Sequence, residues 1–491
     1  MGSVVIIGGG HDGLVAGARL ASEGHRVTVV EARQQPGGSA AGEEFHPGYR
    51  HVGIFHDAST FSDEVARGLG LSLGRRALPD GLIATKDRSC TVGEGLDGVD
   101  PASWSAYRAR IAEVREYARS VLSKAPPRTD AEAPLIPLAK TAWGFRRLGH
   151  QIMMELLRIG PMAVDDWLGE FFDDSVLRAG LALEGLHGTW MGPRSPTSTA
   201  TLLLLESLRG LDVVGGPAAV VRALVERLES AGGTLRCGER VSRITVESGR
   251  VSGVQLESGE TIAADRVIAA CDPRHALLDL VDPLQLPPML ERDISDVRAR
   301  GLAAKVHLAL SGPVQLASKP GIHERILVAG EVDDLERAFD AVKYRQFAAR
   351  LPLDIRVPTV SDPDLAPPGH HVLSILVHAV PHDLEGGWGD SARDRLGSAV
   401  LSTLDAVAPG TSDRVVGMEV LSPADLGERF GLPQGHLWHG ELAIDQLFAA
   451  RPFLGTAQYH TSIGGLQLGS AGCHPGGGFT GLAGWLAAGA S

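Results

Sequence analysis

The sequence predicts an α/β fold in which the first part of the chain builds a parallel sheet, and three observations support this prediction. Residues 3–7, Ser-Val-Val-Ile-Ile, form an apolar run with the length of a buried strand. A glycine-rich turn follows at once, and residues 14–21 then have the composition of a helix. A second strand-like run at 26–30 leads into Glu31. This order of strand, turn, helix and strand is typical of parallel sheets with helices on their faces.

The turn at residues 8–13 carries the pattern G-x-G-x-x-G, with glycine at its first, third and sixth positions. The first glycine allows a tight turn, the second lets the backbone approach a pyrophosphate, and the third lets the helix pack on the strand. N–H groups at the start of the helix attract the phosphates. Glu31 lies about 20 residues further on, where a carboxylate is needed to accept hydrogen bonds from an adenosine ribose. The pattern therefore predicts a dinucleotide site.

The residues after Glu31 indicate which dinucleotide binds. Arg33, Gly37 and Gly38 complete a Glu-x-Arg-(x)3-Gly-Gly extension, for which a plain NAD dehydrogenase has no use. The extension resembles that of flavoproteins, in which the arginine and the paired glycines close over the ribose and pyrophosphate of FAD. The alternative is an exposed arginine beside a glycine turn. We expect FAD.

Two later segments resemble further parts of an FAD site. Residues 215–273 run from a Gly-Gly-Pro helix start into alternating strands, as in the middle FAD segment of the phytoene desaturase and amine oxidase superfamily. There the residue that matches Val241 contacts the adenine through its backbone. No Asp, Glu, Lys or Arg occurs from Pro452 to Ser491, and much of this tail is glycine. We expect it to lie under the flavin, with a helix that begins near Thr480 and directs its dipole at the ring.

The chain is similar to the phytoene-desaturase-like FAD-dependent oxidoreductases, and most closely to the pyridine nucleotide-disulfide oxidoreductase domain-containing protein 2 group. The segments that carry this resemblance span nearly the whole chain and lie at residues 47–50, 192–196, 439–442, 445–448, 451–452 and 474–478. Two departures, Thr197-Ser198-Thr199 and Cys473, bear on substrate fit more than on FAD binding. The motifs and the resemblance together imply a set of FAD contacts: Gly8, Gly10, His11, Asp12, Gly13, Glu31, Arg33, Gly37, Gly38, Ser39, Val241, Cys271, Gly472, Phe479 and Thr480.

The expected architecture is α/β, with a discontinuous Rossmann-type FAD-binding domain plus an α+β substrate domain. The FAD-binding domain comprises residues 1–62, 211–283 and 455–491, and the substrate domain comprises 63–210 and 284–454. Within the first insert, residues 104–122 and 143–157 are the clearest helices. Alternating residues at 303–310 and 371–380 predict strands.

Composition excludes several other classes. A formal net charge of −13 argues against a nucleic-acid surface. The four cysteines are scattered without metal-site spacing, so we expect no disulfide framework, no metal site and a cytoplasmic location. Because the first strand begins within the first few residues, we expect no signal peptide before the fold.

The resemblance implies an FAD-dependent dehydrogenase or oxidase that takes a hydride from a C–C or C–N centre of a small or medium apolar organic substrate. We find no second unit in the inserts in which a strand, a G-x-G-x-x-G turn and a helix follow one another directly, so we expect oxygen, a quinone or another acceptor to reoxidise the flavin. One alternative is a redox-neutral isomerase of a polyene-like substrate. Another is an interaction protein in which FAD is structural.

Four side chains are candidates for proton transfer: His56, His439, Glu441 and His474. Histidine suits this role because its ordinary pKa lies near neutrality. The alternative is that each makes only structural hydrogen bonds, which we favour for His51, His187 and His436. For Glu441 we slightly favour a structural ion pair with Arg451.

Two further hypotheses are weighed against simpler interpretations. Cys473 could bond the flavin covalently, but a small buried residue is the preferred interpretation. The basic residues Lys140, Arg146, Arg147 and Arg158 surround an apolar helical stretch, which could lie on a membrane surface. We favour a core-facing helix with a solvated face, and therefore expect a small-molecule substrate rather than a membrane as the main partner.

Overall fold

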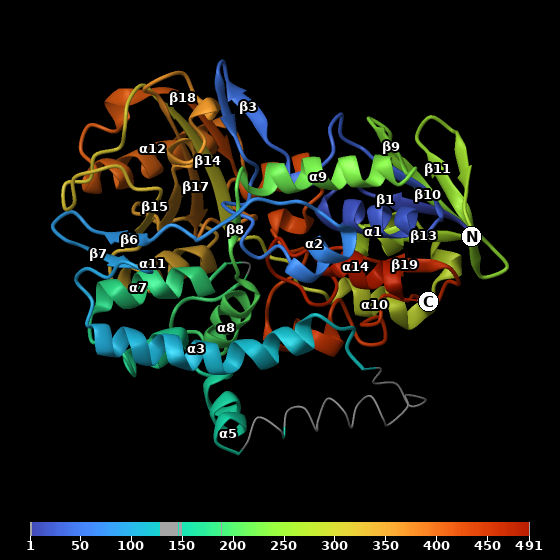
Figure 1. The fold of residues 1–491 in the computed structure, drawn as a ribbon, viewed down its shortest axis with the longest axis horizontal. Helices are drawn as coiled ribbons and strands as arrows, with labels where there is room; N and C mark the ends of the chain where they lie inside the picture. Colours follow the sequence, from blue (N-terminus) through green and yellow to red (C-terminus); the bar gives the residue numbers. More distant parts are fainter. Residues whose placement is uncertain (1, 128–145, 147–149, 188, 491) are drawn as a thin grey trace.

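A computed structural model describes residues 2–127, 146, 150–187 and 189–490 of the chain (Figure 1). A five-stranded sheet occupies the half of the molecule that contains both termini, and a seven-stranded sheet occupies the other half. Most helices of the first insert lie below the seven-stranded half in the view of Figure 1. The predicted α/β fold is confirmed.

The five-stranded sheet joins strands from three separated parts of the chain, and every neighbouring pair is parallel. Its order is β19-β13-β1-β2-β9. The central strand β1 is buried along almost its whole length, as its run of Val and Ile requires. The strands are β1 (Ser3–Ile7), β2 (Arg26–Glu31), β9 (Thr234–Cys237), β13 (Arg266–Ala269) and β19 (Leu466–Leu468).

Helices α1 (His11–Ser22), α9 (Gly216–Ser230) and α14 (Leu482–Gly489) accompany this sheet. Helix α1 is apolar and buried around nearly its whole circumference, because it packs against both α9 and α14. A small antiparallel sheet extends this half of the molecule through β10 (Val241–Glu247), β11 (Arg250–Leu256) and β12 (Thr261–Ala263).

The seven-stranded sheet has the order β18-β14-β17-β16-β15-β6-β7 and is antiparallel except between β15 and β6. One face is apolar and packs against helix α12 (Asp390–Val407) through residues such as Leu396 and Val400. The opposite face carries buried polar side chains. The strands are β6 (Gly81–Ala84), β7 (Ser89–Val92), β14 (Ala303–Leu310), β15 (Arg325–Val328), β16 (Leu353–Arg356), β17 (His371–His378) and β18 (Val415–Leu421).

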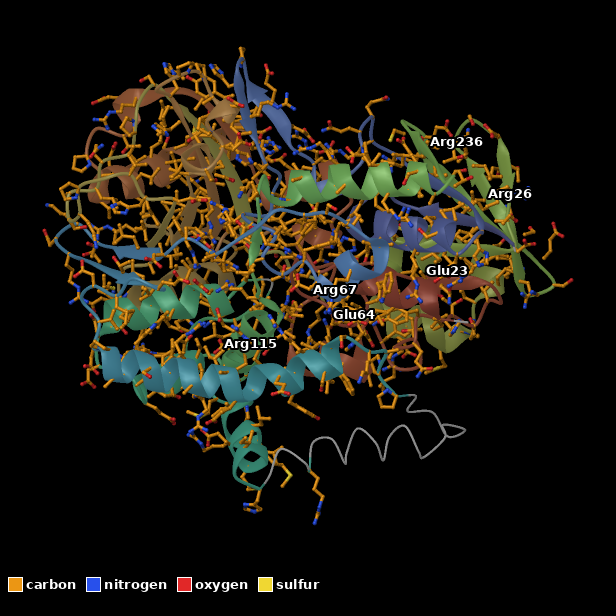
Figure 2. All side chains as sticks on the ribbon, in the orientation of Figure 1. Glu23, Arg26, Glu64, Arg67, Arg115 and Arg236 are labelled. Atoms are coloured by element: carbon orange, nitrogen blue, oxygen red, sulfur yellow. The ribbon has the colours of Figure 1, made fainter. Side chains whose placement is uncertain are left out.

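The remaining helices cover the lower side of the molecule and the edges of the sheets. Figure 2 labels Arg115 on α3, whose guanidinium lies 3.6 Å from the Glu206 carboxylate of α8 and ties these two helices together. The helices are α2 (Asp63–Leu69), α3 (Pro101–Leu122), α5 (His150–Ile159), α6 (Val164–Gly169), α7 (Ser175–Gly185), α8 (Ser198–Leu208), α10 (Pro288–Ser295), α11 (Val332–Lys343) and α13 (Pro423–Phe430). Short two-stranded ribbons pair β3 (Glu43–His46) with β4 (Tyr49–His51) and β5 (Arg75–Arg76) with β8 (Asp212–Val213).

The expected helix at 104–122 corresponds to α3, and residues 150–157 of the one expected at 143–157 belong to α5, whereas residues 143–145 and 147–149 lie outside the described residues. The same holds for Lys140 and Arg147 of the proposed basic face. Arg158 is described, and its guanidinium pairs with both Glu155 and Glu170. Among the described helices, none combines the length and the apolar character needed to cross a membrane.

Candidate functional site

A cavity of about 440 Å³ opens at the carboxyl ends of β1 and β2. Ligands of parallel α/β sheets bind at this edge, and the volume lies in the range of cofactor pockets. Eleven of the residues predicted to contact FAD line it: Gly8, Gly10, His11, Asp12, Glu31, Arg33, Gly37, Gly38, Ser39, Val241 and Cys271.

The glycine-rich turn places the start of α1 at this cavity. A Cβ atom added at Gly10 would meet nothing within 4 Å, so the backbone there is open to a ligand. A Cβ at Gly13 would instead lie 2.0 Å from the carbonyl oxygen of Gly8. Gly13 therefore permits the close packing of helix on turn without lining the cavity itself. The two glycines fit a pyrophosphate site, since one leaves room for the ligand and the other shapes the loop.

Glu31 and Arg33 fix the far side of the turn. The Glu31 carboxylate accepts hydrogen bonds from the backbone N–H groups of Gly9 at 2.7 Å and Arg33 at 2.8 Å. Arg33 donates to the carbonyl oxygen of Gly38 at 2.9 Å and pairs with Glu43. The extension thus forms a braced loop on the cavity wall, in place of the exposed arginine that was the alternative.

None of the four remaining predicted contacts, Gly13, Gly472, Phe479 and Thr480, lines the cavity. The C-terminal tail reaches the cavity wall through Ala471. The Phe479 ring packs 4.5 Å from the ring of His11. Helix α14 begins at Leu482, slightly later than expected, and the N–H of Gly484 donates to the Asp12 carboxylate at 3.2 Å. This contact joins the uncharged tail to α1.

Sequence reasoning missed the wall formed by residues 427–433, at the end of α13 and in the loop that follows. Arg429 in this segment pairs with Glu43, which also holds Arg33. A capping box at Ser422 and a left-handed glycine at Gly431 mark the ends of α13. These signals locate the helix in the sequence, but nothing in them places it beside the cofactor loop.

The four candidates for proton transfer do not form one cluster. His439 lines the cavity, with its Nδ1 3.3 Å from the Ser470 hydroxyl, and burial lowers its pKa to about 3. His474 is buried against the Phe448 ring, and burial lowers its pKa to about 4. His56 lies in the other half of the molecule, with its Nδ1 3.6 Å from the Asp354 carboxylate.

Glu441 is held by an ion-pair network. It is buried and pairs with Arg300 at 2.7 Å and Arg298 at 3.4 Å. The partner expected from the sequence, Arg451, was wrong. The Arg451 guanidinium instead donates to five backbone carbonyl oxygens, those of Trp438, Gly440, Glu441, Gln446 and Ala471. All five bonds come from Nη1 and Nη2, whose N–H groups point in several directions within one plane, which suits this task.

The structure places both departures from the family pattern, Cys473 and the Thr197-Ser198-Thr199 segment, in largely buried surroundings. Burial raises the pKa of the Cys473 thiol to about 12, so the thiol stays protonated at neutral pH. A protonated buried thiol is a poor nucleophile, which favours the simpler interpretation. Ser198, from the Thr197-Ser198-Thr199 segment, accepts a hydrogen bond from the N–H of Val164 at the start of α6.

A second, smaller cavity of about 30 Å³ adjoins the first, and Leu437 lines both. Its walls are mainly apolar, from residues such as Leu183, Leu302 and Phe339. Among its lining residues His187 and His378 stand together, with their Nε2 atoms 2.9 Å apart. His187 was expected to be structural, and His378 was not singled out at all. Their place beside the cofactor cavity makes both functional candidates.

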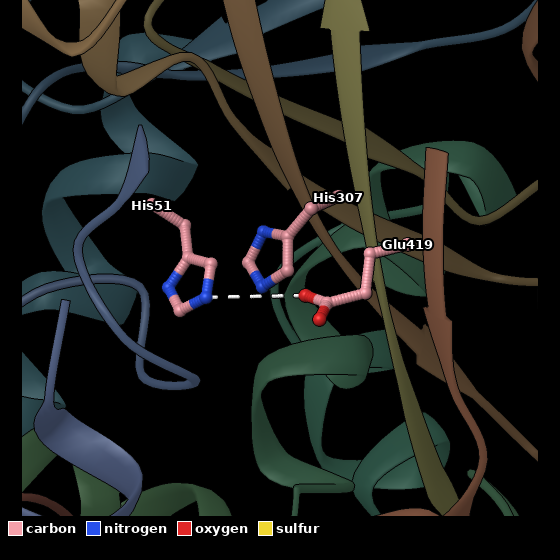
Figure 3. A group of neighbouring side chains, drawn as sticks. All are labelled: His51, His307 and Glu419. Carbon is pink, nitrogen blue, oxygen red and sulfur yellow. Dashed lines mark ion pairs between the residues drawn. The ribbon is translucent and has the colours of Figure 1, made fainter. Parts of the chain in front are cut away.

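Figure 3 shows a second group of polar side chains: His307 of β14, Glu419 of β18 and His51 of β4, which lie close together. His51 and His307 stack at 4.1 Å, and the His51 Nε2 lies 3.9 Å from the Glu419 carboxylate. The set has the spacing of a metal site. However, the N–H of Gly53 donates to His51 Nδ1, so Nε2 carries the proton and has no free lone pair for a metal. Parallel stacked rings also cannot both direct an in-plane lone pair at one ion. We interpret the group as a buried stack of two imidazole rings beside the Glu419 carboxylate.

Comparison with known proteins yields consistent matches. A family model described as flavin containing amine oxidoreductase matches residues 140–422, and one described as NAD(P)-binding Rossmann-like domain matches residues 6–66. The chain is 28% identical to pyridine nucleotide-disulfide oxidoreductase domain-containing protein 2 of Rattus norvegicus, across 99% of this chain and 92% of the relative. It is also 28% identical to the zeta-carotene-forming phytoene desaturase of Myxococcus xanthus, across 77% and 72%.

Solved structures share the fold. A putrescine oxidase bound to putrescine superposes with a TM-score of 0.62 at 17% sequence identity, covering 99% of this chain and 97% of the other. At this level of identity the likeness concerns the fold alone.

Proposed function

The chain belongs to the flavin-containing amine oxidoreductase family and is thus an FAD-dependent oxidoreductase, and we propose that it removes a hydride from a C–C or C–N centre of a small or medium, mainly apolar substrate. The observation that carries this proposal is the pair of adjoining cavities. The larger one has the features of a dinucleotide site, and the smaller one presents apolar walls on the other side of Leu437. Because the smaller space has room for only one or two water molecules, the substrate would lie in the larger cavity, with an apolar group directed at this wall.

The described residues fit FAD. The open backbone at Gly10 and the first turn of α1 would hold the pyrophosphate, and the Glu31 carboxylate would hold the ribose. Val241, at the start of β10, lines the part of the cavity assigned to the adenine. When bound, FAD supplies the hydride acceptor, while the protein positions the substrate and excludes water.

Reoxidation is proposed to use oxygen, a quinone or another acceptor. The support is that the described residues of the inserts form no second parallel unit of strand, G-x-G-x-x-G turn and helix. The pattern recurs at residues 93–98, directly after β7, but β7 is antiparallel to β6 and helix α3 begins only at Pro101. A second nucleotide domain of the Rossmann type usually carries such a turn at the start of its helix.

Anaerobic mixing tests the proposal. Purified protein, loaded with FAD, would be mixed with a panel of primary amines and apolar polyenes that includes putrescine and solubilised phytoene. Loss of flavin absorbance at a rate that saturates with substrate is the expected result. Product formation without bleaching would favour the isomerase alternative. A flavin that stays oxidised with every compound, yet is reduced by dithionite, would contradict the proposed dehydrogenase activity.

A further inference from the structure

Three ionisable side chains outside the cofactor cavity lie in a row across the polar face of the seven-stranded sheet. His378 ends β17, His187 follows α7, and Asp354 belongs to β16. The two histidine rings are near parallel, and their Nε2 atoms share a 2.9 Å hydrogen bond. The same Nε2 of His187 lies 3.9 Å from the Asp354 carboxylate. The row therefore contains two imidazoles with an anion behind the second one.

The row ends at the smaller cavity. His187 and His378 both line this space of about 30 Å³, which is large enough for one or two water molecules. His436 also lines this space, and its Nδ1 accepts a hydrogen bond from the N–H of Trp438; the remaining side chains are apolar, so histidines are the polar groups that a neighbouring group would meet. Leu437 lines both this space and the cofactor cavity, so the two adjoin at this side chain.

The charges around the row set its protonation. Burial lowers the pKa of His187 to about 4 against the opposing charge of Asp354, and burial together with His187 holds the pKa of His378 well below its usual range. Burial disfavours the Asp354 anion, but His56, Arg325 and Arg356 outweigh it and keep the pKa of its carboxyl well below normal. At neutral pH the two imidazoles are therefore neutral, and the carboxylate is charged.

A neutral imidazole backed by a buried carboxylate is the arrangement of a general base, because the anion stabilises the imidazolium that forms. The low pKa values make this base weak. A weak base suffices, however, when the proton leaves together with the hydride, since the positive charge that develops at the oxidised centre makes the neighbouring proton strongly acidic.

We propose that His378 and His187 accept the proton that substrate oxidation releases, and that Asp354 is the positioning residue behind them. This inference rests on the proposed dehydrogenase function. One C–H bond of the substrate breaks as a hydride, which carries its electron pair to the flavin. A second C–H or N–H bond breaks as a proton, and its electrons remain to form the new double bond. The proton binds His378, the shared hydrogen bond passes a proton to His187, and Asp354 offsets the positive charge.

The first test needs no substrate. The protein would be labelled with 15N only at histidine, and NMR would be used to detect the proton shared between the two Nε2 atoms. We expect a downfield N–H signal that is lost in both H187N and H378N and kept in H371N. His371 is a matched control because it lies at the other end of the same strand, where its Nδ1 contacts the Thr359 hydroxyl. Absence of the shared proton in the wild-type protein would overturn the proposal.

The second test measures anaerobic flavin reduction by whichever compound of the panel bleaches the wild type. H187A and H378A are expected to slow reduction about 100-fold or more, as loss of a general base does, with full FAD content. Added imidazole should restore part of the rate, and the solvent isotope effect in D2O should change. A purely structural role would produce neither response. D354N is expected to slow reduction without imidazole rescue.

The outcomes separate the two claims. If the wild type bleaches and the FAD-replete alanine variants bleach as fast, the proton acceptor is wrong while the proposed function stands. If the alanine variants fail to bind FAD, H187N and H378N serve in their place under the same criteria. If no compound bleaches the wild type, the proposed function fails, and this inference fails with it.

Discussion

The two main sheets place their polar groups in different ways. In the five-stranded sheet the strands are apolar, and the groups around the cofactor cavity come from strand ends, as Gly8 follows β1 and Glu31 ends β2. In the seven-stranded sheet, charged side chains such as Lys305 and Asp354 stand within the strands and are fully buried. A tight turn restricts the residue type at each position, because its backbone conformation suits few residues. A strand position accepts many residue types, provided that the side chain suits the face of the sheet on which it lies. The first site therefore leaves a readable pattern, and the second does not.

The largest effect is expected from substitutions in the glycine turn of the five-stranded half, which test whether its pattern reflects ligand binding or packing. G10A and G13A should both lose FAD, observed as loss of the absorbance of bound flavin after purification. Only G13A should also lose much of its thermal stability, because its Cβ meets the Gly8 carbonyl oxygen at 2.0 Å while the one at Gly10 meets nothing within 4 Å. Equal melting temperatures for the two apoproteins would contradict this division between ligand room and packing.

The seven-stranded half should make the protein sensitive to acid. Burial lowers the pKa of His51 to about 3 and that of His56 to about 4, whereas an unfolded histidine titrates near 6.5. Below about pH 6.5 the unfolded chain thus binds protons that the folded chain does not. The contribution of these neutral histidines to the free energy of unfolding is complete above that pH. It is lost as the pH falls toward 4, by about 1.4 kcal/mol for each unit by which the pKa is lowered.

Urea unfolding at several pH values measures this loss. In H56N the dependence of the midpoint on pH should be shallower than in the wild type, and in H275N, which removes a partly exposed histidine, it should be unchanged. A midpoint that stays constant between about pH 7 and 5 would show that the histidines are not buried in their neutral form.

A smaller effect distinguishes a structural from a catalytic role for Glu441. E441Q should lower the free energy of unfolding by about 1–3 kcal/mol, because it weakens hydrogen bonds from two guanidinium groups to a buried acceptor. FAD content should be retained, since Glu441, which pairs with Arg298 and Arg300, does not line the cofactor cavity. Loss of bound flavin without loss of stability would instead support a role in the site.

The last prediction concerns Lys305, whose fully buried ammonium has no hydrogen-bond partner among the described residues. Burial lowers its pKa well below the usual value, against the charge of Asp354. The unfolded chain therefore binds a proton more readily at neutral pH, so this residue costs stability there. K305M should raise the free energy of unfolding by about 1–3 kcal/mol. The control is K343M, because Lys343 forms an exposed ion pair with Asp340. This substitution should change the free energy of unfolding by less than about 0.5 kcal/mol.

The sequence thus predicted the α/β fold and the cofactor turn, and eleven of the fifteen residues that it assigned to FAD line the cavity. It did not predict that His187 and His378 meet, because these residues lie on separate elements and neither belongs to a motif. The alternating polar residues of β14 were visible in a strand that was correctly expected. Which face they occupied could not be known before the pairing of β14 with β17 was fixed. The wrong partner for Glu441 has the same cause, since Arg298 and Arg300 come from a different part of the chain.

The guanidinium of Arg451 has a consequence for engineering. Its five carbonyl partners extend from Trp438 to Ala471, a stretch that contains one three-residue strand and otherwise only short turns. A single side chain thus does the work that a ladder of backbone bonds does elsewhere. A chimera that imports this stretch from a relative should bring the matching arginine with it, and lysine, which has no fork of donors, would be a poor replacement.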